Sequence, residues 1–217
     1  MSIATMILGQ SGTGKSASLR NLDPAKTLLI QCVKKPLPFK ANWSEVSKEH
    51  PSGNIVVRSD SAKIVEAMQK TTREIIVVDD FQYLLAQEFM NRSHEKGYEK
   101  FTEMARHYYD VLMCASSLAN NKRVYLLSHT DTSESGQVKA KTIGKLLDEK
   151  ITVEGLLTIV LRTHVINGNY LFSTHNNGQD TVKTPMGMFS DEFVENDLSA
   201  VDSAICEYYG IQSTQAA

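Results

Sequence analysis

The fold is decided by Ile3-Ala4-Thr5-Met6-Ile7-Leu8 and the residues that follow it directly, Gly9-Gln10-Ser11-Gly12-Thr13-Gly14-Lys15-Ser16. The second stretch, here called the 9–16 loop, fits the pattern G-x-x-x-x-G-K-[ST]. The apolar run before it predicts a strand, and residues 15–22 predict a short helix. Glycines let the backbone curl so that successive N–H groups converge on a phosphate, and the helix adds the positive end of its dipole. A glycine-rich turn with a purely structural role is the alternative.

The 9–16 loop predicts a site for a nucleoside triphosphate, and we expect the cofactors to be ATP and Mg²⁺. Lys15 is expected to reach the β- and γ-phosphate oxygens, and the hydroxyl of Ser16 is expected to bind Mg²⁺. The predicted cofactor-binding residues are Gly9, Gln10, Ser11, Gly12, Thr13, Gly14, Lys15, Ser16 and Ala17.

A second strand end supplies the acidic side of the predicted site. Residues 74–78 are mostly apolar, as in a central parallel strand, and run into Asp79 and Asp80. Because Mg²⁺ prefers oxygen ligands, Asp79 is expected to bind the ion. Asp80 is the leading candidate to orient or deprotonate the attacking water. Asp60, just past a third predicted strand at residues 54–58, is the alternative carboxylate. Capping the helix that begins near Phe81 is the structural alternative for Asp80.

The predicted strand at residues 124–127 ends in Ser128 and His129. Polar side chains at the carboxyl edge of a parallel sheet lie beside bound phosphates, so this pair predicts a γ-phosphate sensor. A hydrogen-bonded pair with only a structural role is the alternative. The full set of catalytic candidates is Lys15, Asp80, Asp60, Ser128 and His129.

Strand-like runs alternate with helical patterns, which predicts an α/β fold with a mostly parallel sheet flanked by helices. Residues 130–141 have no period and are expected to form a flexible loop. The dipeptide Asn167-Gly168 joins two β-rich runs, residues 157–165 and 170–174, and predicts an antiparallel hairpin extension. A closing helix is expected over residues 197–209. We expect one domain over residues 1–211 and a disordered tail at 212–217.

Composition narrows the class of protein. The 217 residues are 41% hydrophobic and 22% charged, which disfavours collagen-like, disordered and coiled-coil proteins. Cys32, Cys114 and Cys206 lie far apart and support neither a zinc site nor a disulfide framework. The chain shows no signal-peptide pattern and no apolar run of about 20 residues, so we expect a cytoplasmic protein without membrane contact. The formal net charge of -2 confines any nucleic-acid contact to local patches.

Several phrases together resemble phage ATP-binding proteins with a RecA-like P-loop core, a grouping that includes compact single-strand annealing ATPases. They are the 9–16 loop, Ser18-Leu19-Arg20-Asn21-Leu22-Asp23-Pro24, Lys35-Pro36-Leu37-Pro38-Phe39, Val78-Asp79-Asp80-Phe81, Leu127-Ser128-His129 and Thr184-Pro185-Met186-Gly187-Met188-Phe189. The similarity runs from Ile3 to about Phe189. It implies an ATPase that binds single-stranded DNA and promotes annealing or strand exchange in phage-type recombination. It also implies a homo-oligomer in the host cytoplasm, with phage or host single-strand-binding or recombination proteins as partners.

The RecA-like plan places two DNA-contacting loops after the fourth and fifth strands, here at about residues 91–100 and 131–145. Cations and an aromatic ring in these loops suit backbone tracking and base stacking. The candidate DNA-binding residues are Arg92, Lys96, Tyr98, Lys100, Lys139, Lys141 and Lys145. Solvated polar loops are the structural alternative, because acidic residues are interspersed.

The sequence departs from the RecA-like pattern at one catalytic position, and three other functions compete with the one that the resemblance implies. RecA-type recombinases carry a catalytic glutamate after a strand near the phosphate loop, whereas the second predicted strand here ends in Cys32-Val33. Turnover is therefore expected to be slow or dependent on DNA. A helicase or helicase-loader ATPase and a nucleotide-binding switch without turnover are the alternatives. A small-molecule kinase is disfavoured because residues 130–141 contain no arginine for a lid.

Overall fold

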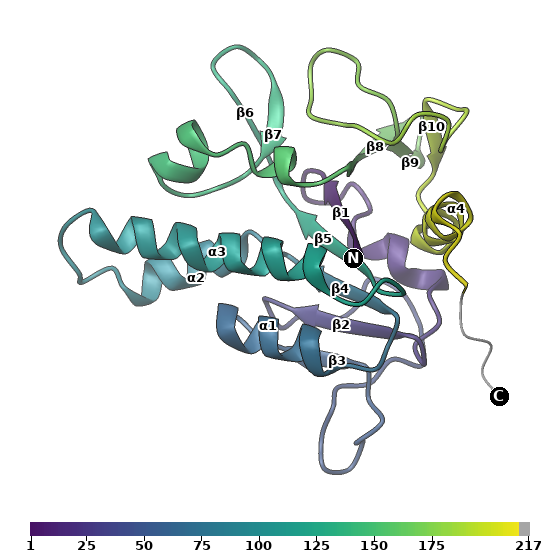
Figure 1. Cartoon of the computed structure of the whole chain (residues 1–217), viewed down its shortest axis with the longest axis horizontal. Coiled ribbons are helices and arrows are strands. Elements are labelled where there is room, and N and C mark those ends of the chain that lie inside the picture. The colour runs from purple at the N-terminus through teal and green to yellow at the C-terminus, as the bar shows by residue number, and fades with distance from the viewer. Residues whose placement is uncertain (213–217) are drawn as a thin grey trace.

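The centre of the protein is an eight-stranded sheet with the order β10-β9-β8-β1-β5-β4-β2-β3. In the computed structural model, which describes residues 1–212, every neighbouring pair from β8 to β3 is parallel, and β9 and β10 are antiparallel (Figure 1). The strands of this sheet are β1 (Ile3–Leu8), β2 (Thr27–Gln31), β3 (Ile55–Val57), β4 (Ile75–Asp79), β5 (Arg123–Ser128), β8 (Ile159–Ile166), β9 (Asn169–Ser173) and β10 (Phe193–Glu195). The predicted α/β class with a mostly parallel sheet is confirmed. The predicted tail falls, apart from Gln212, outside the described residues.

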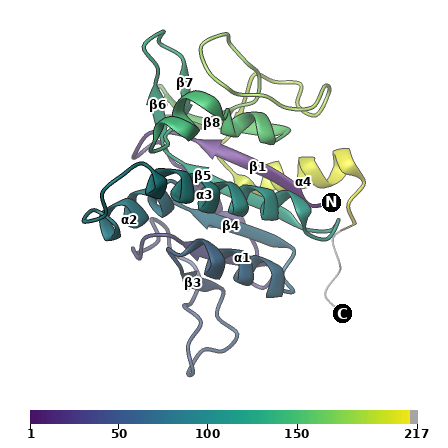
Figure 2. The same cartoon turned by 60° about the vertical axis from the view of Figure 1, so that its left-hand side comes forward.

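Helices cover both faces of the sheet (Figures 1 and 2). The described helices are α1 (Ser61–Lys70), α2 (Tyr83–Asn91), α3 (Glu99–Ser117) and α4 (Leu198–Tyr209), with 3-10 turns η1 (Ser16–Asn21) and η3 (Val153–Leu156) and a π turn η2 (Leu146–Lys150). None of the described helices has the length and apolar character needed to cross a membrane.

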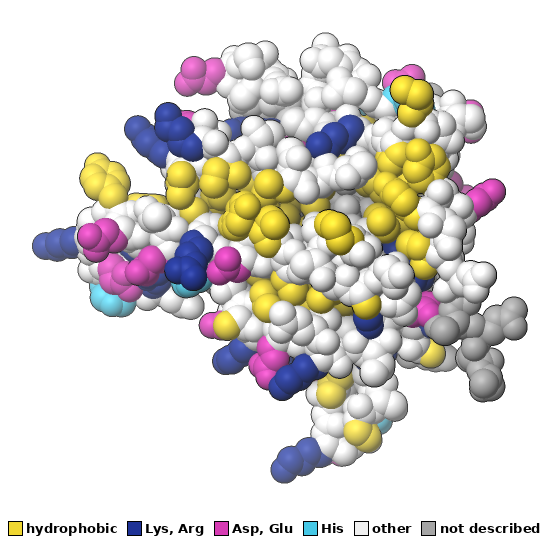
Figure 3. Space-filling model, in the orientation of Figure 1, with side chains coloured by type: hydrophobic (Ala, Val, Ile, Leu, Met, Phe, Trp, Pro, Cys, Tyr) yellow, Lys and Arg dark blue, Asp and Glu magenta, His cyan; other side chains and the backbone are white. Residues whose placement is uncertain are grey.

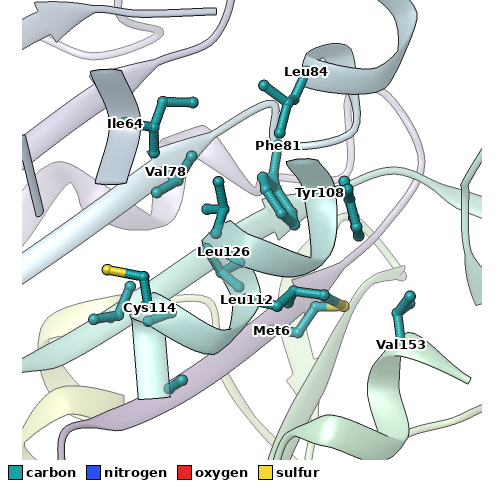
Figure 4. Close-up of a cluster of buried hydrophobic side chains, with 14 of the residues drawn as sticks. Met6, Ile64, Val78, Phe81, Leu84, Tyr108, Leu112, Cys114, Leu126 and Val153 are labelled. Atoms are coloured by element: carbon teal, nitrogen blue, oxygen red, sulfur yellow. The ribbon is translucent and has the colours of Figure 1, made fainter. Parts of the chain in front are cut away.

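Side chains along β1 point alternately to the two faces of the sheet, so this strand contributes to two separate hydrophobic cores. Met6 and Leu8 pack into a cluster with side chains of α1, α2 and α3, whereas Ile7 packs against η1 and α4 on the opposite face. Figure 4 shows the first cluster, in which the rings of Phe81 and Tyr108 stack with centroids 4.2 Å apart. Since both faces of β1, β4 and β5 are buried, these strands read as continuous apolar runs, which is why the sequence predicts them well.

The order of the strands positions three polar strand ends at one edge of the sheet. β5 lies between β1 and β4 and runs parallel to both. The 9–16 loop follows β1, Asp79 and Asp80 stand at the end of β4, and Ser128 and His129 stand at the end of β5. Parallel strands end at the same edge, so these segments meet although they are far apart in the sequence.

One prediction about the later part of the chain is wrong, and another is confirmed. Residues 130–141 form a hairpin of β6 (Thr130–Thr132) and β7 (Val138–Ala140) rather than an irregular loop. Distant partners fix it, because the buried carboxylate of Glu154 accepts from the N–H of Ala140 at 2.7 Å and the N–H of Val138 donates to the carbonyl of Gln179 at 2.8 Å. The predicted antiparallel hairpin is confirmed, since β8 and β9 pair antiparallel on either side of Asn167-Gly168, and β8 joins the hairpin to the sheet by pairing parallel with β1.

Candidate functional site

The 9–16 loop adopts the tight curl that its glycines predict. Gly12 and Gly14 have φ of 79° and 97°, in the region that side chains disfavour. A Cβ on Gly14 would also lie 2.9 Å from Cδ1 of Tyr170. The loop is supported from β8, where the hydroxyls of Thr13 and Thr163 lie 2.5 Å apart. Glycine at position 14 is therefore required twice, by the backbone angle and by the ring of Tyr170.

Lys15 is folded back over its own loop. Its Nζ donates to the carbonyls of Gly9 at 2.7 Å and Gln10 at 2.9 Å, and the residue is only 6% exposed. Burial lowers the pKa of Lys15 to about 8, although the carboxylates of Asp80 and Asp79 oppose the shift. The ammonium group is thus held by carbonyl oxygens of its own loop, in surroundings that disfavour its charge.

Ser16 and Asp79 form the oxygen pair that the sequence predicts. The hydroxyl of Ser16 donates to Asp79, with Oγ 3.0 Å from each carboxylate oxygen. Asp79 is 1% exposed; burial and the neighbouring charge of Asp80 raise its pKa. A hydroxyl and a carboxylate suit Mg²⁺, which would complete its coordination with phosphate oxygens and water. Among residues 1–212, no group of three or more His, Cys, Asp or Glu side chains could hold a metal ion.

Asp80 has a strained backbone, and its carboxylate faces Lys35 and His129. Its φ is 59°, which is uncommon for a residue other than glycine. One carboxylate oxygen pairs with Nζ of Lys35, and the other lies 3.6 Å from Nε2 of His129. Burial would raise the pKa of Asp80, but His129 and Lys35 outweigh it and the pKa is lowered. The side chain does not cap α2, so the capping alternative for Asp80 is wrong; Gln82 precedes that helix.

Two other catalytic candidates lie away from this arrangement. Ser128 is fully buried and lies beside Tyr108, on the α3 face of β5. Asp60 is the N-cap of α1 and accepts from the N–H of Lys63 at 2.9 Å, after the edge strand β3. Neither side chain lines the cleft described next. The alternation of β5 turns Ser128 inward, and β2 and β4 lie between β5 and β3, the strand that Asp60 follows. The structure therefore keeps both side chains away from the cleft, although the carbonyl of Ser128 accepts a hydrogen bond from the N–H of Gly9 at 3.1 Å.

A cleft of about 380 Å³ collects most of the remaining site residues; Gly9, Gln10, Thr13 and Asp79 are not among those that line it. Of the predicted set, it is lined by Ser11, Gly12, Gly14, Lys15, Ser16, Ala17, Asp80 and His129. The sequence reasoning missed Lys35, Pro36, Pro38 and Tyr170 as site residues, although they also line it. The proline-rich run that follows β2 at the carboxyl edge is a signal that could have found the first three. No local signal marks Tyr170, which β9 brings to the loop.

A second cleft, of about 300 Å³, adjoins the first, since Ser11 and His129 line both. It also contains Tyr83, whose ring meets the ring of His129 edge to face, and Lys141 of the second candidate DNA loop. The N–H of His129 donates to Oε1 of Gln82 at 2.9 Å. His129 therefore stands between the two clefts.

The seven DNA-binding candidates differ in availability. Arg92 is held by Glu88, Glu95 and Glu103, and Figure 3 shows side chains of both charges gathered over the connection between α2 and α3. Lys100 is 9% exposed, and its Nζ donates to the carbonyl of Glu95 at 2.8 Å, so it has a structural role. Lys139 donates to the carbonyl of Asp148. The exposed candidates are Lys96, Tyr98, Lys141 and Lys145.

Comparison with known proteins gave no match to any protein-family model and no significantly similar curated protein.

Proposed function

We propose that the protein is a RecA-like P-loop ATPase whose 380 Å³ cleft binds ATP and hydrolyses its terminal phosphate. The observation that carries this proposal is the juxtaposition of the 9–16 loop with a buried carboxylate, in which Ser16 Oγ lies 3.0 Å from Asp79. The loop offers convergent N–H groups and an ammonium to an anion, and the Ser16–Asp79 pair offers hard oxygen ligands to a cation. Phosphate and Mg²⁺ bound together satisfy both.

Each polar residue then has a separate task. Lys15 exchanges the carbonyls of Gly9 and Gln10 for phosphate oxygens, and Ser16 and Asp79 hold Mg²⁺. When bound, Mg²⁺ neutralises charge on the phosphate oxygens. Asp80 orients the attacking water, beside His129. The bond from the water oxygen to the γ-phosphorus forms while the bond to the β–γ bridging oxygen breaks, giving ADP and phosphate.

The nucleoside fits a third cleft, of about 540 Å³, which adjoins the first through Ala17 and Tyr170. Tyr170 is 49% exposed and offers a ring face for stacking. Asn196 also lines this cleft, is 2% exposed, and its amide nitrogen has no hydrogen-bond partner. A buried amide without a partner is costly, so a ribose or base oxygen is a suitable ligand for it.

Single-stranded DNA is the polymer that we propose the ATPase acts on, in annealing or strand exchange. The support is the second cleft, where an aromatic ring, Tyr83, and a cation, Lys141, lie one residue, His129, away from the ATP cleft. Exposed Lys96, Tyr98 and Lys145 would extend the contact, completed by assembly into a homo-oligomer and by phage or host recombination proteins. Buried Lys100 is left out of this surface.

A nucleotide-binding switch without turnover is the second candidate function. The pairing of Asp80 with both Lys35 and His129 favours it, because a carboxylate with a lowered pKa is a weak base.

The test is the rate of Mg²⁺-dependent ATP hydrolysis with and without single-stranded DNA. The wild type is expected to hydrolyse ATP faster with DNA, and Asp79→Asn is expected to reduce the rate by at least about tenfold because the carboxylate ligand is lost. Asp110→Asn, on the exposed face of α3, is the matched control. ATP binding without hydrolysis, with or without DNA, would mean that the protein is a nucleotide-binding switch and not an ATPase. ATP-dependent unwinding of duplex DNA would mean that it is a helicase and not an annealing protein.

A further inference from the structure

Two lysines from different elements converge on the same cleft. Lys15 belongs to the 9–16 loop, and Lys35 comes from the segment after β2. The positive charge of Lys35 contributes to lowering the pKa of Lys15, so the two ammonium groups are close enough to repel each other. Like charges gathered in one cleft raise its affinity for an anion more highly charged than a single carboxylate.

The backbone around Lys35 is anchored, whereas its side chain is not. The side-chain amide of Gln31 donates to the carbonyl of Lys35 at 3.0 Å, and that of Gln87 donates to the carbonyl of Cys32 at 2.9 Å. Pro36 follows directly and restricts the backbone further. The Lys35 side chain, by contrast, is 43% exposed. The ammonium can therefore change partners while the segment that carries it stays in place.

Asp80 is the partner of Lys35 in this structure, and it can lose that partner. The Asp80 side chain is 3% exposed, and its second oxygen faces His129. If Lys35 moved away, the carboxylate would still face Nε2 of His129, 3.6 Å from its other oxygen.

We propose that Lys35 is a second phosphate-binding residue, which contacts the terminal phosphate of a bound nucleoside triphosphate and pairs with Asp80 when that phosphate is absent. This inference rests on the proposed ATP site. A diphosphate has no terminal group beside Asp80 and His129, so Lys35 would favour ATP over ADP. The exchange also frees one oxygen of Asp80 to accept a hydrogen bond from water when ATP is bound.

Affinities for Mg²⁺-ATP and Mg²⁺-ADP, measured by calorimetry, test the proposal. Lys35→Ala is expected to weaken ATP binding by about tenfold, the loss of one charge-assisted hydrogen bond, and to change ADP binding by less than about threefold. Lys34→Ala is the control, because Lys34 is the adjacent lysine and pairs with Glu45 outside the cleft; it is expected to change neither. An unchanged ratio of the two affinities in Lys35→Ala would overturn the proposal.

Asp80→Asn provides an independent arm. Asparagine tolerates the positive φ of position 80, so this variant keeps the backbone while removing the resting partner of Lys35. In that background Lys35→Ala is expected to weaken ATP binding by more than it does in the wild type, because Lys35 no longer has to leave a carboxylate. An equal or smaller effect would refute Asp80 as the resting partner. Absence of nucleotide binding by the wild type would overturn the proposed function itself.

Discussion

Lys15 is the residue whose protonation matters most to the proposed site. It is buried among carbonyl groups of the loop, and this burial lowers its pKa to about 8. Asp80 and Asp79 keep the shift from being larger. Because this pKa is low for a lysine, Lys15 gives up its proton readily and its neutral amine can leave the carbonyls. Only the charged ammonium binds phosphate well. Its proton is thus part of the binding equilibrium.

Raising the pH from 7.5 to 9.5 is therefore expected to weaken ATP binding. Above a free-state pKa of about 8, most Lys15 side chains are neutral and must take up a proton on binding, so the affinity falls by up to about tenfold per pH unit. Calorimetry in buffers of different ionisation enthalpy measures this proton uptake. Lys15→Arg, which stays charged throughout, is the control for the pH profile. A wild-type affinity that is constant across this range would contradict the assignment.

Single residues also mark the limit of prediction from sequence. The 9–16 loop could be predicted because its positions are adjacent in the chain and each glycine or lysine has a local reason. Tyr170 could not be predicted in this way, because β9 delivers it to the cleft from a distant part of the chain, whereas the proline-rich run after β2 is a signal that could have found Lys35. Ser128 was assigned to the site from its place at a strand end, but the alternation of β5 turns it toward Tyr108.

At the scale of elements, β5 and α4 are joined by a buried ion pair. The guanidinium of Arg123 donates to both oxygens of Asp202, at 3.0 and 2.9 Å, and the hydroxyl of Tyr125 donates to Asp202 at 2.6 Å. Arg123 is 2% exposed. The pair ties the strand between β1 and β4 to the helix on the opposite face from α3, so it helps to fix the sheet on which the site is built.

Asp202→Ala is expected to lower the free energy of unfolding by about 3 kcal/mol, because it removes the carboxylate that accepts two hydrogen bonds from the buried Arg123 and leaves Glu74, at 3.5 Å, as the carboxylate beside that charge. Urea denaturation followed by circular dichroism measures the change. Asp110→Ala removes an exposed carboxylate 3.8 Å from Arg106 and is expected to cost less than about 1 kcal/mol. Equal midpoints for Asp202→Ala and the wild type would show that the pair is not stabilising.

Elements were predictable where their signal is local. Apolar runs gave β1, β4 and β5 to within a residue or two, and Asn167-Gly168 marked the turn between β8 and β9. The β6–β7 hairpin could not be predicted, because the hydrogen bonds that order it come from Glu154 and Gln179, which lie outside it. The parallel pairing of β8 with β1 likewise depends on how the whole chain is arranged, and no residue pattern within β8 predicts it.

At the scale of the whole molecule, one edge of the sheet gathers the chemistry. β1, β5 and β4 deliver the loop, His129 and the two aspartates, and β8 and β9 close the loop from the other side. The first cleft shares Ser11 and His129 with the second, and Ala17 and Tyr170 with the third. The formal net charge of -2 is compatible with anion binding at this edge, because Lys15 and Lys35 line the first cleft and Lys141 lines the second.

The most direct test of an ATP site at this edge is equilibrium binding of Mg²⁺-ATP by the wild type and by Lys15→Ala, with circular dichroism confirming that both are folded. The wild type is expected to bind, and the substitution is expected to raise the Kd by at least about tenfold because a buried charge-assisted contact to phosphate is lost. Wild-type and Lys15→Ala proteins with the same Kd, or a folded wild type that binds no ATP, would contradict the proposed site.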